Sequence, residues 1–87
     1  MFDPIVQRKL ELAQAAAQLA ADGDVPPCAA ARLAVAKELS ARADAVYQRA
    51  LRAPSLAAKE REQGYAQELR RTAAQLEHEA RECTATA

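Results

Sequence analysis

The stretch Leu51-Arg52-Ala53-Pro54-Ser55-Leu56 decides the fold of this chain, because it holds the only proline between two long helical patterns. Proline lacks the amide donor that a helix interior needs, and Ser55 is a favourable N-cap residue for a new helix. With so short a link, the flanking helices are expected to fold back on each other as an antiparallel hairpin. One long helix bent at Pro54 is the alternative geometry.

A second break, Asp22-Gly23-Asp24-Val25-Pro26-Pro27, separates an N-terminal segment from this hairpin. Glycine commonly ends a helix, and the two prolines prevent its continuation. At the other end of the segment, Asp3 is a good N-cap residue and Pro4 fits the first helical position. The predicted fold class is all-α, a single three-helix bundle in which a shorter N-terminal helix packs on the long hairpin. The predicted helices cover 4–21, 26–52 and 55–83, with a frayed tail at 84–87.

The composition favours helix and limits the size of the core. The 87 residues include 24 Ala and two Gly, but only nine Leu, four Val, one Ile and one Phe. Alanine has the highest helix propensity and loses no side-chain entropy on folding. The core should therefore be thin, with backbones in close approach, and a partner subunit could add stability. Many Arg and few Lys among so many Ala suggest a small bacterial or phage protein.

The charge balance argues against a general affinity for nucleic acid. The chain has 12 Lys+Arg and 12 Asp+Glu, so its formal net charge is zero. A basic stripe of Arg42, Arg49 and Arg52 lacks the aromatic neighbours on which bases stack, which leaves weak nucleic-acid binding as a minor alternative. No apolar run reaches the ~18 residues of a membrane span, and the N-terminal segment lacks the apolar region of a signal peptide. We therefore expect a cytoplasmic protein with no membrane span.

Motifs for catalysis, cofactors and metals are absent from the sequence. There is no Gly-rich phosphate loop, no nucleophile elbow and no His-Glu-x-x-His. The lone His78 shares its helix face with Glu82, and one His with one carboxylate is an incomplete metal site. We expect no enzyme, no cofactor and no bound metal.

The two cysteines lie at opposite ends of the predicted hairpin helices. Cys28 opens the second helix and Cys83 closes the third, so an antiparallel hairpin brings them to the same level. A disulfide is then feasible if their Cα atoms come within about 4.4–6.8 Å, and it would add about 4 kcal/mol to the stability. The alternatives are two buried reduced thiols, the state expected in a reducing cytoplasm, and a reactive Cys28 thiol at a helix N-terminus.

Helical periodicity predicts which side chains meet inside the hairpin. Glu62 falls within the apolar face of the third helix near the turn, where Arg49 or another residue near the turn is its expected ion-pair partner. The expected apolar contacts are Leu39 and Val46 against Leu69 and Tyr65, and Val35 against Leu76.

The first two predicted helices carry more apolar surface than contact with one neighbouring helix would bury. Leu33, Tyr47 and Leu51 widen the apolar face of the second helix, and Val6 and Leu10 lie on the matching flank of the first. A short N-terminal helix can cover only part of this surface, so these five residues are the candidate partner-binding site. The opposite apolar edge of the first helix consists of Ile5, Leu12, Ala16 and Leu19.

Helix-in-groove recognition uses apolar anchors at such helical spacings. The sequence therefore predicts a non-catalytic protein–protein interaction module, acting as an adaptor, co-chaperone or inhibitor of a larger protein. A coiled-coil-like homodimer, in which the same surface pairs with itself across a two-fold axis, is the alternative.

Overall fold

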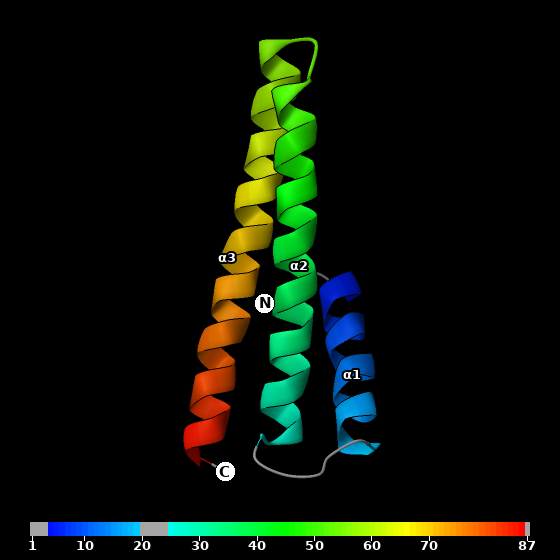
Figure 1. Cartoon of the computed structure of the whole chain (residues 1–87), viewed down its shortest axis with the longest axis vertical. Helices are drawn as coiled ribbons and strands as arrows, with labels where there is room; N and C mark the ends of the chain where they lie inside the picture. The colour runs from blue at the N-terminus through cyan, green and yellow to red at the C-terminus, as the bar shows by residue number, and fades with distance from the viewer. Residues whose placement is uncertain (1–3, 20–24, 87) are drawn as a thin grey trace.

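The computed structural model describes residues 4–19 and 25–86, which form three α-helices. Helix α1 covers Pro4–Leu19, α2 covers Pro27–Leu51 and α3 covers Leu56–Thr86. Figure 1 shows α2 and α3 side by side as a long antiparallel hairpin, with α1 along one half of α2. The all-α fold and the three-helix bundle are thus confirmed, and the hairpin at Pro54 replaces the alternative of one bent helix.

The helices lie in a row rather than in a triangle. Helix α1 packs on α2, and none of its described Cα atoms lies within 8 Å of a Cα atom of α3. The molecule is elongated along the hairpin, with extents of 48 × 21 × 21 Å. One side of α1 therefore faces away from the rest of the protein.

Local chemistry explains the bounds of the hairpin helices. Helix α2 starts with a proline, whose missing amide donor costs nothing in the first turn. At its C-terminus, the amide of Arg52 donates to the Arg49 carbonyl at 3.1 Å, and Pro54 follows two residues later. The Ser55 hydroxyl then accepts a hydrogen bond from the Ala58 amide at 3.1 Å, which confirms Ser55 as the N-cap of α3. The predicted Asp3 cap and residues 20–21 lie outside the described residues.

The C-terminal end of α3 corrects one expectation. The sequence predicted a frayed tail over 84–87, but α3 continues to Thr86. The Thr84 hydroxyl donates to the Ala80 carbonyl at 2.9 Å, a bond that leaves the helix intact. Position 87 lies outside the described residues.

The core between α2 and α3 is built mainly of alanine. Alanine side chains let the two backbones approach closely, and the larger side chains interdigitate between them. Leu39 and Val46 of α2 and Leu69 and Leu76 of α3 belong to one buried cluster, as predicted. The buried residues are Leu10, Ala29, Ala31, Val35, Ala36, Leu39, Ala43, Val46, Ala50, Ala66, Leu69, Ala73, Leu76 and Ala80.

Tyr65 is the exception, and the prediction that it lies in the seam is wrong. Its side chain is 46% exposed, whereas the neighbouring Ala66 is buried. The two positions are about 100° apart on the helix, and the closely packed seam accepts the methyl group in place of the ring. The seam of α3 is therefore rotated toward Ala66.

Three ion pairs connect α2 to α3 along the length of the hairpin. The predicted pair near the turn is confirmed, because Arg49 donates two hydrogen bonds to one carboxylate oxygen of Glu62, at 2.9 and 3.1 Å. Exposed pairs of this kind contribute at most about 1 kcal/mol each, so they fix the register more than they stabilise it. The other two pairs are Asp44–Arg70, at 3.1 Å, and Arg32–Glu79, at 3.2 Å.

Helix α1 is held by fewer contacts. Leu10 is buried in the core cluster, with Val6 and Ala13 packed partly against it. The Lys9 ammonium donates to Glu38 of α2 at 2.5 Å. This hydrogen bond, aided by the positive charges of Lys9 and Arg42, lowers the pKa of Glu38 below its ordinary value, although partial burial opposes the shift.

No helix within the described ranges, 4–19 and 25–86, is both long enough and apolar enough to cross a bilayer.

Candidate interaction surfaces

The distribution of leucine is the most unusual feature of the molecule's surface. Four of the nine leucines are buried, and five are exposed. Most of the core positions are instead taken by alanine. Within residues 4–19 and 25–86, the exposed large apolar side chains are Ile5, Leu12, Leu19, Val25, Leu33, Tyr47, Leu51, Leu56 and Tyr65.

One group of these residues lies on α2 and is called the docking face below. It consists of Leu33, Tyr47 and Leu51, whose side chains are 46%, 39% and 52% exposed. Their spacings of 14 and four residues place them within about 40° of each other on the helix. Glu38, which contacts α1, lies about 140–180° away from them. The docking face therefore points away from α1, and the sequence prediction that these three residues lie outside the core agrees with their exposure.

A side chain of α3 borders the docking face at Tyr47. The Arg70 guanidinium lies over the Tyr47 ring, 5.7 Å from its centroid, and also donates to Asp44 at 3.1 Å. The cation–π contact and the ion pair together hold the ring in place and give it a charged rim. The sequence reasoning missed Arg70, because its approach to Tyr47 depends on the register between two helices. The only available signal was that Asp44 and Tyr47 share a helix face.

The other end of the docking face borders a hollow. An apolar depression of about 230 Å³ is lined by Leu33 of α2 and by Ala80, Arg81 and Thr84 of α3. The face is thus not confined to one helix, since α3 supplies part of the surface beside Leu33. A depression of this size admits one or two apolar side chains of a partner, but is below the usual range for small-molecule sites.

Two of the five predicted partner-binding residues take part in the packing of α1 on α2. Leu10 is only 5% exposed, and Val6 is partly buried against the core. The burial of Leu10 argues against its assignment to the binding surface, and Val6 is only partly accessible. Helix α1 has two apolar edges, and the edge with these two residues is the one that packs against α2.

The opposite edge of α1 is the one left in solvent, and it is called the outer stripe. It consists of Ile5, Leu12, Ala16 and Leu19, and the three large side chains are 65%, 56% and 91% exposed. These positions fall within an arc of about 60°. The sequence shows both edges of the helix, but only docking on α2 reveals which edge remains open.

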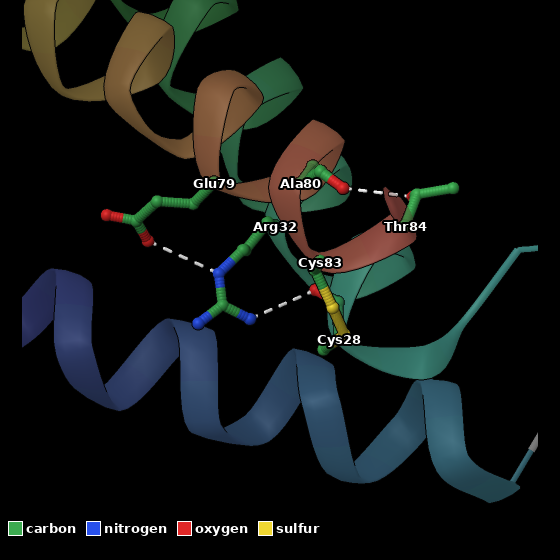
Figure 2. Close-up of a disulfide and its surroundings, with 6 residues drawn as sticks. All are labelled: Cys28, Arg32, Glu79, Ala80, Cys83 and Thr84. Atoms are coloured by element: carbon green, nitrogen blue, oxygen red, sulfur yellow. Dashed lines mark hydrogen bonds and ion pairs between the residues drawn. A yellow bond between two sulfur atoms is a disulfide. The ribbon is translucent and has the colours of Figure 1, made fainter. Parts of the chain in front are cut away.

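The far end of the hairpin is closed by a disulfide between Cys28 and Cys83 (Figure 2). Their Cα atoms are 6.6 Å apart, within the normal range for a disulfide. Of the alternatives left open by the sequence, the structure therefore takes the disulfide. The bond joins the start of α2 to the end of α3, opposite the turn at Pro54.

Arg32 reinforces the same end. Figure 2 shows its side chain reaching from α2 to Glu79 of α3, where Nε donates at 3.2 Å. Its Nη1 also donates to the Cys28 carbonyl at 3.2 Å. An open hollow of about 460 Å³ lies here, lined by Gln14, Cys28, Arg32, Glu79, Glu82 and Cys83. The carboxylates of Glu79 and Glu82 outnumber the single guanidinium of Arg32, which already donates to Glu79 and to the Cys28 carbonyl. The hollow therefore does not suit an anionic ligand, and Arg32 serves to hold the ends of α2 and α3 together.

Three of the residues singled out in the sequence, His78, Arg42 and Arg49, each lie beside an acidic side chain. His78 Nε2 lies 2.8 Å from Glu82, and the described part of the chain has no group of three or more side chains arranged to hold a metal ion. In the basic stripe, Arg49 pairs with Glu62 and Arg42 lies 3.9 Å from Glu38. These pairs offset the positive charge that a nucleic-acid surface would need.

Comparisons with known proteins give no match: no protein-family model, no curated protein and no solved structure resembles this chain.

Proposed function

We propose that this protein is a non-catalytic protein–protein interaction module that binds a larger protein through the docking face of α2. The observation that carries the proposal is the exposure of five of the nine leucines while the core is lined with alanine. Isolated apolar side chains on a surface are ordinary, but rows of them along a helix are typical of interaction sites. On this basis the large side chains serve recognition, and the alanines and the disulfide serve the fold.

The chemistry of the docking face suits an amphipathic helix of the partner. Leu33, Tyr47 and Leu51 supply anchors along about five turns of α2, and the hollow beside Leu33 can receive an apolar side chain. Tyr47 is the expected hot spot, because aromatic residues bury large area at low entropic cost. Arg70 and Asp44 would form part of the polar rim. Adaptor, co-chaperone and inhibitor are the three roles that this mode of binding would serve.

The partner-binding proposal is tested with a photo-crosslinking residue placed at position 47 in cells of the source organism. A matched probe at Glu68, an exposed position of α3, serves as the control. A partner specific to position 47 is then purified, and its affinity for Tyr47→Ala and Leu51→Ala variants is measured. We expect each variant to keep its helical circular dichroism and to lose at least about tenfold in affinity, which is the loss typical of a hot-spot residue.

Two outcomes would contradict this proposal. If Tyr47→Ala unfolds the protein while the remaining folded fraction still binds, then Tyr47 belongs to the core. If an Arg71→Ala control lowers the affinity for the partner as much as Leu51→Ala does, the binding surface lies on the charged faces instead.

The compartment is tested separately. The sequence favours the cytoplasm, whereas disulfides persist mainly in oxidising compartments. Trapping the thiols with an alkylating reagent in intact cells distinguishes the two locations. Modified Cys28 and Cys83 would support the reducing cytoplasm, and resistance until a reductant is added would support an oxidising compartment.

A further inference from the structure

We infer that the outer stripe of α1 binds a second copy of this chain, with the two α1 helices antiparallel across a two-fold axis at Leu12. This interface is separate from the docking face, so neither proposal depends on the other. The outer stripe lies on the helix that packs only on α2, and its large side chains are among the most exposed of the chain.

The spacing of the stripe supports a self-complementary interface. Ile5, Leu12 and Leu19 are seven residues apart, so Ile5 and Leu19 lie at equal distances on either side of Leu12. In an antiparallel pair centred on Leu12, that residue meets its own copy and Ile5 meets Leu19 of the other chain. A two-fold interface requires this kind of correspondence, because each patch must complement itself.

The charges of α1 favour the antiparallel direction. Arg8, Lys9 and Glu11 all lie in the first half of the helix, and the segment 12–19 contains only Leu, Ala and Gln. An antiparallel arrangement places the charged half of one helix beside the uncharged half of the other. A parallel arrangement would bring Arg8 close to its own copy, and like charges in contact are destabilising.

The exposed area is large enough for this interface. The protein exposes 6051 Å² of surface, against about 5,000 Å² for a compact monomer of 9.4 kDa. The excess of about 1,000 Å² is close to the ~800 Å² that each partner contributes to a standard stable interface. The elongated shape of the whole molecule creates this extra area, and the outer stripe of α1 is one part of it.

Sedimentation equilibrium of the purified protein at micromolar concentration tests the inference, and a dimer is expected for the wild type. Leu12→Glu and Leu12→Lys should each be monomeric, because the two-fold axis places two like charges together. A mixture of the two variants should form a heterodimer. As a matched control, Leu51→Glu on the docking face should dimerise like the wild type. Circular dichroism checks that each variant is folded, which the exposure of both positions leads us to expect.

The direction of pairing has its own test. Ile5→Glu mixed with Leu19→Lys should restore dimers lost by each variant alone, because position 5 meets position 19 only in the antiparallel pair. Restoration by Ile5→Glu mixed with Ile5→Lys would show a parallel pair and overturn the geometry. A monomeric wild type, or loss of the dimer in Leu51→Glu but not in Leu12→Glu, would overturn the inference. Crosslinking of a different protein at position 47 tests the docking face separately, so neither result of the dimer test decides it.

Discussion

The α2–α3 hairpin and helix α1 contrast in how they are held, although both are rich in alanine. The hairpin has a long buried seam, a disulfide at its open end and three ion pairs along its length. Helix α1 has one buried leucine, two partly buried neighbours and one hydrogen-bonded ion pair to α2. Local stability follows the density of buried contacts. The hairpin is therefore the structural unit, and α1 is a weakly attached element whose outer face is open.

Removal of the disulfide should have the largest effect on this contrast. Cys28 and Cys83 are 55 residues apart in sequence, and closing a loop of that length contributes about 4 kcal/mol in the chain-entropy model. The Cys28→Ala/Cys83→Ala variant should lose this amount in urea unfolding, and reduction of the wild type should do the same. Reductant should leave the double variant unchanged. If the reduced and oxidised wild types unfold at the same urea concentration, the disulfide does not stabilise the hairpin.

Shortening a core side chain of the hairpin should have the next largest effect on stability. Leu69 is buried in the α2–α3 seam, and Leu69→Ala should lower the free energy of unfolding by about 3 kcal/mol. Leu56 is also on α3 but is exposed, so Leu56→Ala should change it by less than about 0.5 kcal/mol. Both values come from urea unfolding. Equal effects of the two changes would contradict the position of the seam.

Shortening the Leu10 side chain should weaken the attachment of α1 to the hairpin. Leu10 is the one fully buried side chain of α1, so Leu10→Ala should weaken the docking of this helix by about 2 kcal/mol. Amide hydrogen exchange should accelerate throughout α1 and stay nearly unchanged in α2 and α3. The exposed Gln18→Ala variant of the same helix should exchange like the wild type. Faster exchange throughout the hairpin would show that the three helices form one cooperative unit.

Acidification should affect the attachment of α1 to a smaller extent. The hydrogen bond from Lys9 lowers the pKa of Glu38 in the folded state, so this carboxylate stabilises the fold above its ordinary pKa of 4.5. The contribution is lost as the pH falls through the lowered folded-state value. The exposed pair should contribute below about 1 kcal/mol. Glu38→Gln should remove the difference in α1 protection factors, which are corrected for the intrinsic pH dependence of amide exchange, between neutral and acidic solution. A difference in protection that persists in this variant would assign it to another group.

The sequence by itself determined the elements of this fold and the partners at the ends of the hairpin. Proline and serine at positions 54 and 55 define the turn, because one removes a backbone donor and the other caps the next helix. Once the turn is fixed, counting residues outward along two helices brings Cys28 to Cys83 and Arg49 to Glu62. Such pairings follow from the constant rise of a helix and need no knowledge of packing.

The tertiary structure alone decided which apolar edges are covered. Helix α1 has two edges of similar hydrophobicity, and only its docking on α2 places Val6 and Leu10 inside and Ile5, Leu12 and Leu19 outside. Packing also decided the exposure of Tyr65, because the closely packed contact between α2 and α3 buries the small Ala66 and leaves the neighbouring ring in solvent. Periodicity reports the direction of each side chain around its own helix axis, but burial depends on where a second helix lies, and that is set by the fit of two surfaces together.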